Sequence, residues 1–93
     1  MVEKSSLQAF VKGHVQGVFF RAFVLEKAEL LDLNGYVCNL PTGEVEVRAE
    51  GSKANLESLI VYLKKGPPAS RVDEVTTQWS NYRGKYSHFM IKD

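Results

Sequence analysis

The sequence has a single cysteine in 93 residues and contains no long hydrophobic run. One cysteine cannot form an intramolecular disulfide, and such a chain is typical of a reducing compartment. No apolar stretch approaches the roughly 20 residues that span a bilayer, and the first six residues lack the apolar core of a signal peptide. We therefore expect a cytoplasmic protein that does not enter a membrane.

Neither sign of charge is in marked excess, because 12 Lys and Arg oppose 11 Asp and Glu and leave a formal net charge of +1. This balance predicts no general attraction to nucleic acid or to anionic lipid. His14 and His88 have no second His or Cys at ligand spacing, so we expect no metal site. Apolar residues are plentiful at 44 %. With no linker or repeat, residues 1–93 are expected to form one domain and to act as a monomer.

A turn at residues 13–21 separates two regular patterns. Apolar and polar residues alternate over residues 7–12, which predicts a strand. Phe20, Val24 and Ala28 then recur at helical spacing. The turn between them therefore leads into a helix N-terminus, whose free N–H groups and partial positive charge favour an anion. Arg21, in the first helical turn, adds a planar cation that matches the oxygens of a phosphate.

The same turn contains no Cys, Ser, Thr, Asp, Glu or Lys. A nucleotide-binding P-loop requires Gly-Lys-Ser/Thr, and the dinucleotide fingerprint requires a third glycine. A phosphatase with a covalent intermediate requires a nucleophilic side chain facing the phosphate. If the bound anion is attacked, the sequence therefore predicts that water attacks it.

The rest of the chain predicts a short series of strands with a second helix. Asn34 and Gly35 are expected to end the first helix, residues 20–33, in a left-handed cap. Ser52 is expected to cap the second helix, which turns Leu56, Leu59, Ile60 and Leu63 inward. The expected strands are residues 36–40, residues 44–50 with Glu44, Glu46, Arg48 and Glu50 facing water, residues 72–79 and residues 88–92.

This order predicts an α+β fold of the ferredoxin-like α/β sandwich type. The elements follow β-α-β-β-α-β with an extra short C-terminal strand. Two helices are expected on one face of an antiparallel sheet.

Two stretches of the chain resemble the signatures of a known family. Residues 13–21 fit Gly-x-Val-Gln-Gly-Val-x-Phe-Arg, which resembles the first signature of the acylphosphatases. The second signature is matched by Gly35-Tyr36-Val37-Cys38-Asn39, Gly43-x-Val45 and Gly51. The resemblance covers essentially the whole chain. It implies the same fold and the hydrolysis of acyl phosphates to a carboxylate and inorganic phosphate, without a metal or other cofactor.

The resemblance also implies roles for individual residues. Arg21 falls on the phosphate-binding arginine of the family and Asn39 on its water-positioning asparagine. Cys38 stands where family members more often carry a long or basic residue. Gln16 either binds substrate or braces the loop through its side chain, and we favour bracing. The expected phosphate-binding set, mostly through backbone N–H groups, is Val15, Gln16, Gly17, Val18, Phe19, Phe20 and Arg21.

Two other functions remain compatible with the predicted topology. RNA-recognition domains share the β-α-β-β-α-β order, but their RNA-binding strand carries aromatic residues and a basic lead-in. Here the corresponding strand, residues 44–50, is mostly acidic, which argues against RNA. A catalytically silent protein that senses phosphorylated metabolites would use the same site residues.

The resemblance to the acylphosphatases implies two partners, a small acyl phosphate as substrate and inorganic phosphate as product and inhibitor.

Overall fold

The computed structural model describes residues 2–93, and the predicted order of elements is confirmed. The order is β-α-β-β-α-β, followed by the extra strand at the C-terminus. The elements are β1 (Lys4–His14), α1 (Phe20–Leu30), β2 (Asn34–Asn39), β3 (Val45–Ser52), α2 (Lys53–Lys65), β4 (Arg71–Asn81) and β5 (Phe89–Lys92).

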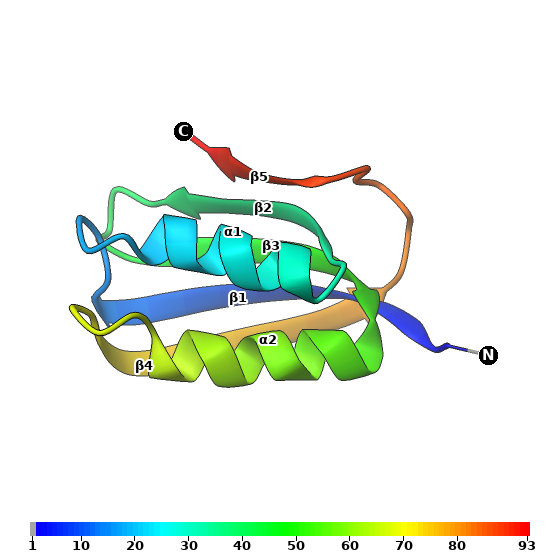
Figure 1. The fold of residues 1–93 in the computed structure, drawn as a ribbon, viewed down its shortest axis with the longest axis horizontal. Coiled ribbons are helices and arrows are strands. Elements are labelled where there is room, and N and C mark those ends of the chain that lie inside the picture. Colours follow the sequence, from blue (N-terminus) through cyan, green and yellow to red (C-terminus); the bar gives the residue numbers. More distant parts are fainter. Residues whose placement is uncertain (1) are drawn as a thin grey trace.

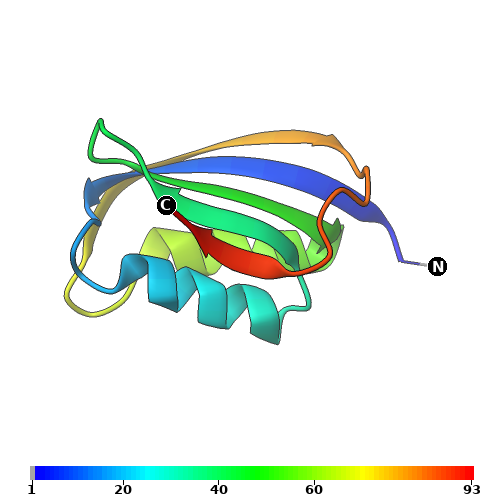
Figure 2. The ribbon, with the colours of Figure 1, turned by 90° about the horizontal axis from the view of Figure 1, so that it is seen from above.

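The strands form one sheet in the order β4-β1-β3-β2-β5, and both helices lie on one face of it (Figures 1 and 2). The pairs β1–β3, β1–β4 and β2–β3 are antiparallel, whereas β5 lies parallel to β2, so the sheet is mixed rather than wholly antiparallel. The reason is topological. Because β4 runs opposite to β1, the chain leaves β4 at the end of the sheet where β2 begins. After crossing that end it can only run alongside β2 in the same direction.

The core lies between the sheet and the two helices. From α2, Leu56, Leu59 and Leu63 are fully buried as predicted, while Ile60 is only partly buried. Ser52 caps α2, because its side chain accepts a hydrogen bond from the Asn55 N–H. Neither helix within residues 2–93 is both long and apolar enough to cross a membrane. The sheet and α1 contribute the remaining core residues, chiefly Leu7, Ala9, Val11, Phe20, Val24, Ala28, Val37, Val45, Val47 and Ala49.

The end of α1 differs from the prediction. The helix stops at Leu30, and Asn34 and Gly35 already belong to β2. The left-handed residue is Asp32, with φ 56°. The N–H of Asp32 bonds the carbonyl of Glu29, and the N–H of Leu33 bonds the carbonyl of Ala28. These two bonds form a Schellman cap with aspartate in the position that glycine usually occupies. The expected cap at Asn34-Gly35 was therefore wrong.

Glu50 also departs from the prediction, which placed it in water. Its exposed fraction is 3 %. The carboxylate accepts hydrogen bonds from the backbone N–H groups of Arg83, at 3.0 Å, and Lys85, at 2.8 Å. The segment between β4 and β5 crosses this end of the sheet and covers the side chain. Glu50 therefore anchors the crossing that brings β5 alongside β2.

We predict that Glu50→Ala destabilises the fold, because the backbone N–H groups of Arg83 and Lys85 lose the carboxylate that accepts their hydrogen bonds and the side chain that fills this buried position is removed. The expected loss is about 2 kcal/mol in the free energy of unfolding, which corresponds to a melting temperature lower by roughly 10 °C. Urea unfolding and thermal melts measure both quantities. Glu57→Ala, at an exposed site on α2, is the matched control. A loss for Glu50→Ala no greater than that of the control would contradict the anchoring role.

Candidate active site

The turn between β1 and α1 leaves the start of the helix without a cap. Gly17 has φ 74° and Phe19, at the N-cap position, has φ 62°, so the turn passes twice through the left-handed region. No side chain caps the helix, and its first turn contains no acidic residue. The first N–H groups of α1 therefore lack partners within the helix, and their partial positive charge is not neutralised locally.

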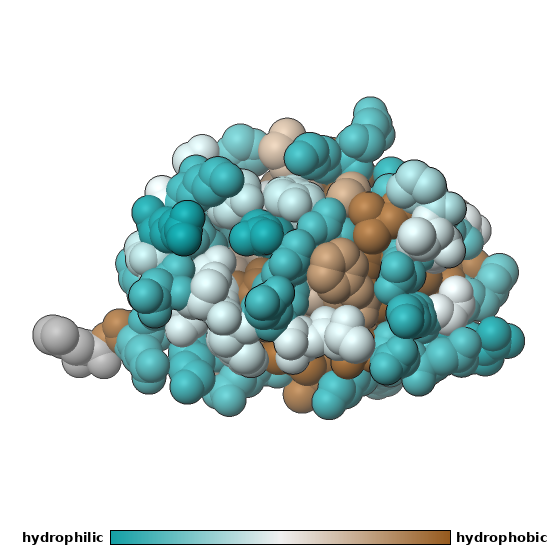
Figure 3. Space-filling view, turned by 180° about the vertical axis from the view of Figure 1, so that it is seen from behind, coloured by the Kyte–Doolittle hydropathy of each residue, from teal (hydrophilic) through white to brown (hydrophobic). Residues whose placement is uncertain are grey.

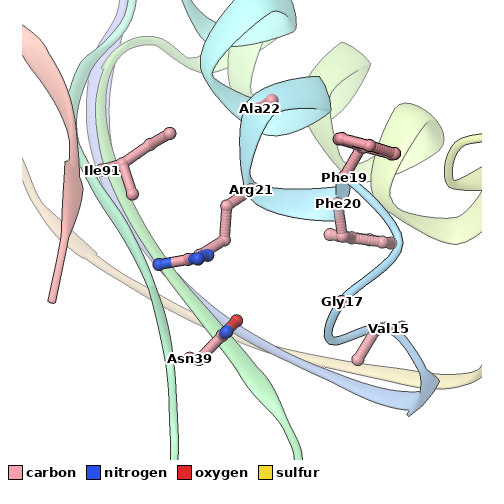
Figure 4. A pocket seen from close by; sticks show the side chains of 8 residues that line it. All are labelled: Val15, Gly17, Phe19, Phe20, Arg21, Ala22, Asn39 and Ile91. Atoms are coloured by element: carbon pink, nitrogen blue, oxygen red, sulfur yellow. The ribbon is translucent and has the colours of Figure 1, made fainter.

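A cavity of about 300 Å³ opens beside this turn. Figure 4 shows the side chains of Arg21 and Asn39 directed into the same space, with the turn on one side and Ile91 of β5 on the other. Arg21 comes from α1 and Asn39 from the end of β2, so the fold brings together residues from the two signatures. The lining residues are Val15, Gly17, Phe19, Phe20, Arg21, Ala22, Asn39 and Ile91.

Arg21 supplies the cationic group of the cavity. It is partly buried, and it forms no ion pair with a carboxylate anywhere in residues 2–93. The guanidinium presents five N–H donors in a planar fork, a geometry that suits two oxygens of one phosphoryl group. The arginine and the uncapped helix start together make this cavity suited to an anion.

Asn39 supplies an acceptor that no protein group satisfies. Its Oδ1 is buried, and no donor within the described residues 2–93 forms a hydrogen bond with it. Such an atom costs about 1–3 kcal/mol relative to a paired one, so buried acceptors without a partner are uncommon. The observation fits a group that receives its hydrogen bond from a small molecule in the cavity.

Gln16 braces the turn, as favoured from the sequence. Its Nε2 donates to the carbonyl oxygen of Leu40 at 2.8 Å and to that of Glu44 at 2.9 Å. Both acceptors belong to the connection between β2 and β3, immediately after Asn39. The side chain therefore ties the turn to the segment that positions Asn39.

The cavity does not include every residue expected to bind phosphate. Val15, Gly17, Phe19 and Phe20 line it together with Arg21, whereas Gln16 and Val18 do not. The Val18 side chain is 8 % exposed and belongs to the core. That the backbone N–H groups of Gln16 and Val18 bind phosphate stays a prediction.

The sequence interpretation missed Ala22 and Ile91, which also line the cavity. Ala22 lies next to Arg21 on α1, and the helical pattern alone could have placed it near the site. No comparable signal existed for Ile91. Its position depends on the parallel pairing of β5 with β2, which the sequence did not reveal.

Cys38 faces away from the cavity. Side chains alternate along β2, so its thiol lies on the helix-free face of the sheet, which is largely hydrophilic (Figure 3). The Sγ donates a hydrogen bond to Glu46 at 3.4 Å. Burial, and then the neighbouring Glu46, raise the pKa of the Cys38 thiol. The thiol therefore stays protonated at neutral pH and is a poor nucleophile.

No group of three or more His, Cys, Asp or Glu side chains within residues 2–93 is arranged to hold a metal ion. The independence from metals remains a prediction for experiment.

We predict that inorganic phosphate binds in this cavity. An NMR titration should shift the backbone amide signals of residues 15–20 and the side-chain signals of Arg21, because Arg21 and most residues of this turn line the cavity. The amides of residues 76–81 serve as the internal control, because this half of β4 pairs with the part of β1 that lies away from the turn. Shifts concentrated at the C-terminal end of α2, where Lys64 and Lys65 also carry positive charge, would contradict this placement.

Comparison with known proteins agrees with the two signatures. The family model for acylphosphatase matches residues 7–91. An acylphosphatase from Thermus thermophilus is 53 % identical over 78 residues, which cover 84 % of this chain and 89 % of that protein. The acylphosphatase structure from Bacillus subtilis has a TM-score of 0.93 at 35 % identity, covering 96 % of this chain and 99 % of that one. The one from Coxiella burnetii has a TM-score of 0.91 at 38 % identity, covering 97 % and 94 %. The chain therefore belongs to the acylphosphatase family of enzymes.

Proposed function

We propose that this chain hydrolyses acyl phosphates to a carboxylate and inorganic phosphate, and that Arg21 and Asn39 carry the reaction. The observation that supports this most directly is the meeting of three features in one cavity. These are an uncapped helix start, an arginine without an ion-pair partner and a buried amide oxygen without a donor. None of the three features alone identifies a function, but together they supply the groups that hold a phosphoryl group and orient water.

Arg21 and the backbone N–H groups of residues 15–20 bind the phosphoryl oxygens in this proposal. The guanidinium and the amides are fixed donors, so little reorganisation is needed as charge shifts in the transition state. Phosphoryl transfer through a loose transition state depends mainly on positioning and charge stabilisation. A site with so few polar side chains is sufficient for that task.

Asn39 orients the attacking water by accepting a hydrogen bond at Oδ1. The water oxygen forms a bond to phosphorus while the bond from phosphorus to the acyl oxygen breaks, and the carboxylate leaves with the electron pair. A carboxylic acid has a pKa of about 4, so this leaving group needs no general acid. The proton of the water passes to an oxygen of the phosphoryl group itself. An amide suits the role because it carries no charge that would repel the phosphate.

The remaining elements of the proposal concern the setting of the reaction. Residues 1–93 act as one monomeric domain in the cytoplasm, without a cofactor and without binding nucleic acid or a membrane. Cys38 takes no part, because its protonated thiol lies on the other face of the sheet. A silent sensor with the same residues would bind phosphate without turnover, so kinetics separates it from the enzyme.

We predict that the purified protein hydrolyses benzoyl phosphate and that excess EDTA leaves the rate unchanged. The loss of absorbance of the acyl phosphate measures turnover directly, and Arg71→Ala, on the exposed strand β4, serves as an active control. Loss of activity on chelation with recovery in Mg²⁺ or Zn²⁺ would disprove the mechanism. Phosphate binding without hydrolysis would identify a sensor instead.

We further predict that variants of Arg21 and Asn39 fail in different ways. Arg21 contacts the phosphoryl group before and during reaction, so Arg21→Ala should weaken phosphate binding and nearly abolish turnover. Arg21→Lys should recover little, because an ammonium cannot replace the fork. Asn39 contacts only the attacking water. Asn39→Ala should therefore retain phosphate affinity while kcat falls on the order of a hundredfold or more.

Calorimetric titration with phosphate and steady-state kinetics test these two assignments, and melting curves verify that each variant is folded. Arg71→Ala and Asn81→Ala, both on exposed positions of β4, are matched controls for the two residue types. If Asn39→Ala loses phosphate binding as severely as Arg21→Ala, the division of roles is wrong. If it keeps full turnover, Asn39 has no part in positioning water.

A further inference from the structure

We propose that Gln16 is a positioning residue for the reaction, because its side chain holds Asn39 in the place from which Asn39 orients the attacking water. The proposal rests on the hydrolysis of acyl phosphates proposed above. The Gln16 side chain does not line the cavity, so it is not placed to touch a bound substrate. An effect of this side chain on turnover therefore passes through the groups that it bonds.

Asn39 lies at an end of the sheet where the pairing between strands stops. It forms the last pair of β2 with β3, opposite Val45, whereas the pairing of β2 with β5 already ends at Cys38. Within residues 2–93, the Asn39 backbone is thus paired with a strand on one side only. Its Oδ1 receives no hydrogen bond from these residues, so no protein donor fixes that end of the amide. The position of Asn39 therefore depends on the segment that follows it.

The Gln16 amide bonds that segment at both of its ends. Its Nε2 carries two N–H donors and lies 2.8 Å from the carbonyl oxygen of Leu40 and 2.9 Å from that of Glu44. The Leu40 N–H also donates to the Glu44 carbonyl, and the Gly43 N–H donates to the Leu40 carbonyl. One amino group thus holds a tight connection whose first residue directly follows Asn39.

The two side-chain bonds are not needed to satisfy the carbonyls of Leu40 and Glu44. Each carbonyl also has a backbone donor, so removing the Gln16 amide leaves neither acceptor without a partner and costs little stability. What is lost is the link between the turn and the connection after Asn39. A small displacement of a group that orients one reactant lowers the rate, even where the other reactant is still bound.

The experiment compares Gln16→Met, which keeps the length of the side chain and removes its donors, with the wild-type protein on benzoyl phosphate. We predict that kcat falls about tenfold or more, because the attacking water is oriented less well. The dissociation constant for inorganic phosphate, from calorimetric titration, should change less than about twofold, because Arg21 and the backbone N–H groups are retained.

Gln8→Met is the matched control. Gln8 is also half-buried, and its Nε2 donates to Glu46 at 2.8 Å on the helix-free face of the sheet. The control should leave kcat unchanged. Gln16→Asn retains the amide but is one methylene too short to reach both carbonyls, so its kcat should fall as well. This second variant keeps the test decisive if melting curves show that Gln16→Met folds poorly.

A double-mutant cycle with Asn39→Ala tests the route of the effect. If Gln16 acts through Asn39, adding Gln16→Met to Asn39→Ala should lower kcat further by less than about twofold, because no amide remains to be positioned. A general structural contribution of Gln16 would instead lower kcat by the same factor in both backgrounds.

The outcomes separate this proposal from the proposed function. The positioning role is overturned, and the proposed function stands, if Gln16→Met keeps full kcat, binds phosphate much more weakly, adds its full effect to Asn39→Ala, or resembles Gln8→Met. If Asn39→Ala keeps full turnover, the roles of both residues are overturned while hydrolysis stands. If the wild-type protein does not hydrolyse benzoyl phosphate, both proposals are overturned. A fall in kcat at constant phosphate affinity that disappears in the Asn39→Ala background supports the role of Gln16.

Discussion

The two hydrogen bonds of the Gln16 side chain join the halves of the candidate site. Gln16 Nε2 reaches from the turn after β1 to the carbonyl oxygens of Leu40 and Glu44. Those carbonyls flank the tip of the β2–β3 connection, and Leu40 directly follows Asn39. Because the glutamine bonds both ends of this short connection, it couples the position of the turn to that of Asn39. In the proposed mechanism, this coupling sets the distance between the bound phosphoryl group and its attacking water.

The cavity contains two polar groups, the Arg21 guanidinium and Asn39 Oδ1, that have no partner among the described residues. Arg21 has no carboxylate partner in residues 2–93, although carboxylates occur on the neighbouring strands. Glu46 pairs with Cys38, next to the pair of Val45 and Asn39, so its side chain points to the opposite face of the sheet. There its carboxylate accepts hydrogen bonds from Gln8 and Tyr36. Strand alternation thus keeps a negative charge out of the cavity in which we propose that an anion binds. The same alternation turns Cys38 away, so the departure from the family pattern at that position lies outside the cavity.

Most of the fold and the centre of the site could be predicted because they follow from local patterns. The 3.6-residue and two-residue periods defined the helices and strands, and the two glycine-containing signatures identified Arg21 and Asn39. What could not be predicted depends on contacts between distant segments. Glu50 looked like a solvent-facing residue in a clean alternation, yet the crossing from β4 to β5 supplies two N–H donors and buries it. Ile91 entered the cavity only because that crossing carries β5 to the far edge of the sheet.

The two helices differ in how they begin, and the difference bears on function. Ser52 caps α2 through a side-chain oxygen, the usual arrangement at a helix start. The corresponding position of α1 holds Phe19 in a left-handed conformation with no capping side chain. Such a backbone conformation costs a non-glycine residue about 1–3 kcal/mol, and a missing cap costs about 1 kcal/mol more. A capping oxygen would compete with a phosphoryl oxygen for the same N–H groups, and an acidic residue in the first turn would neutralise the same positive potential. The uncapped start leaves the N–H groups of α1 available, and in the proposed function a bound phosphoryl group supplies the cap that the sequence omits.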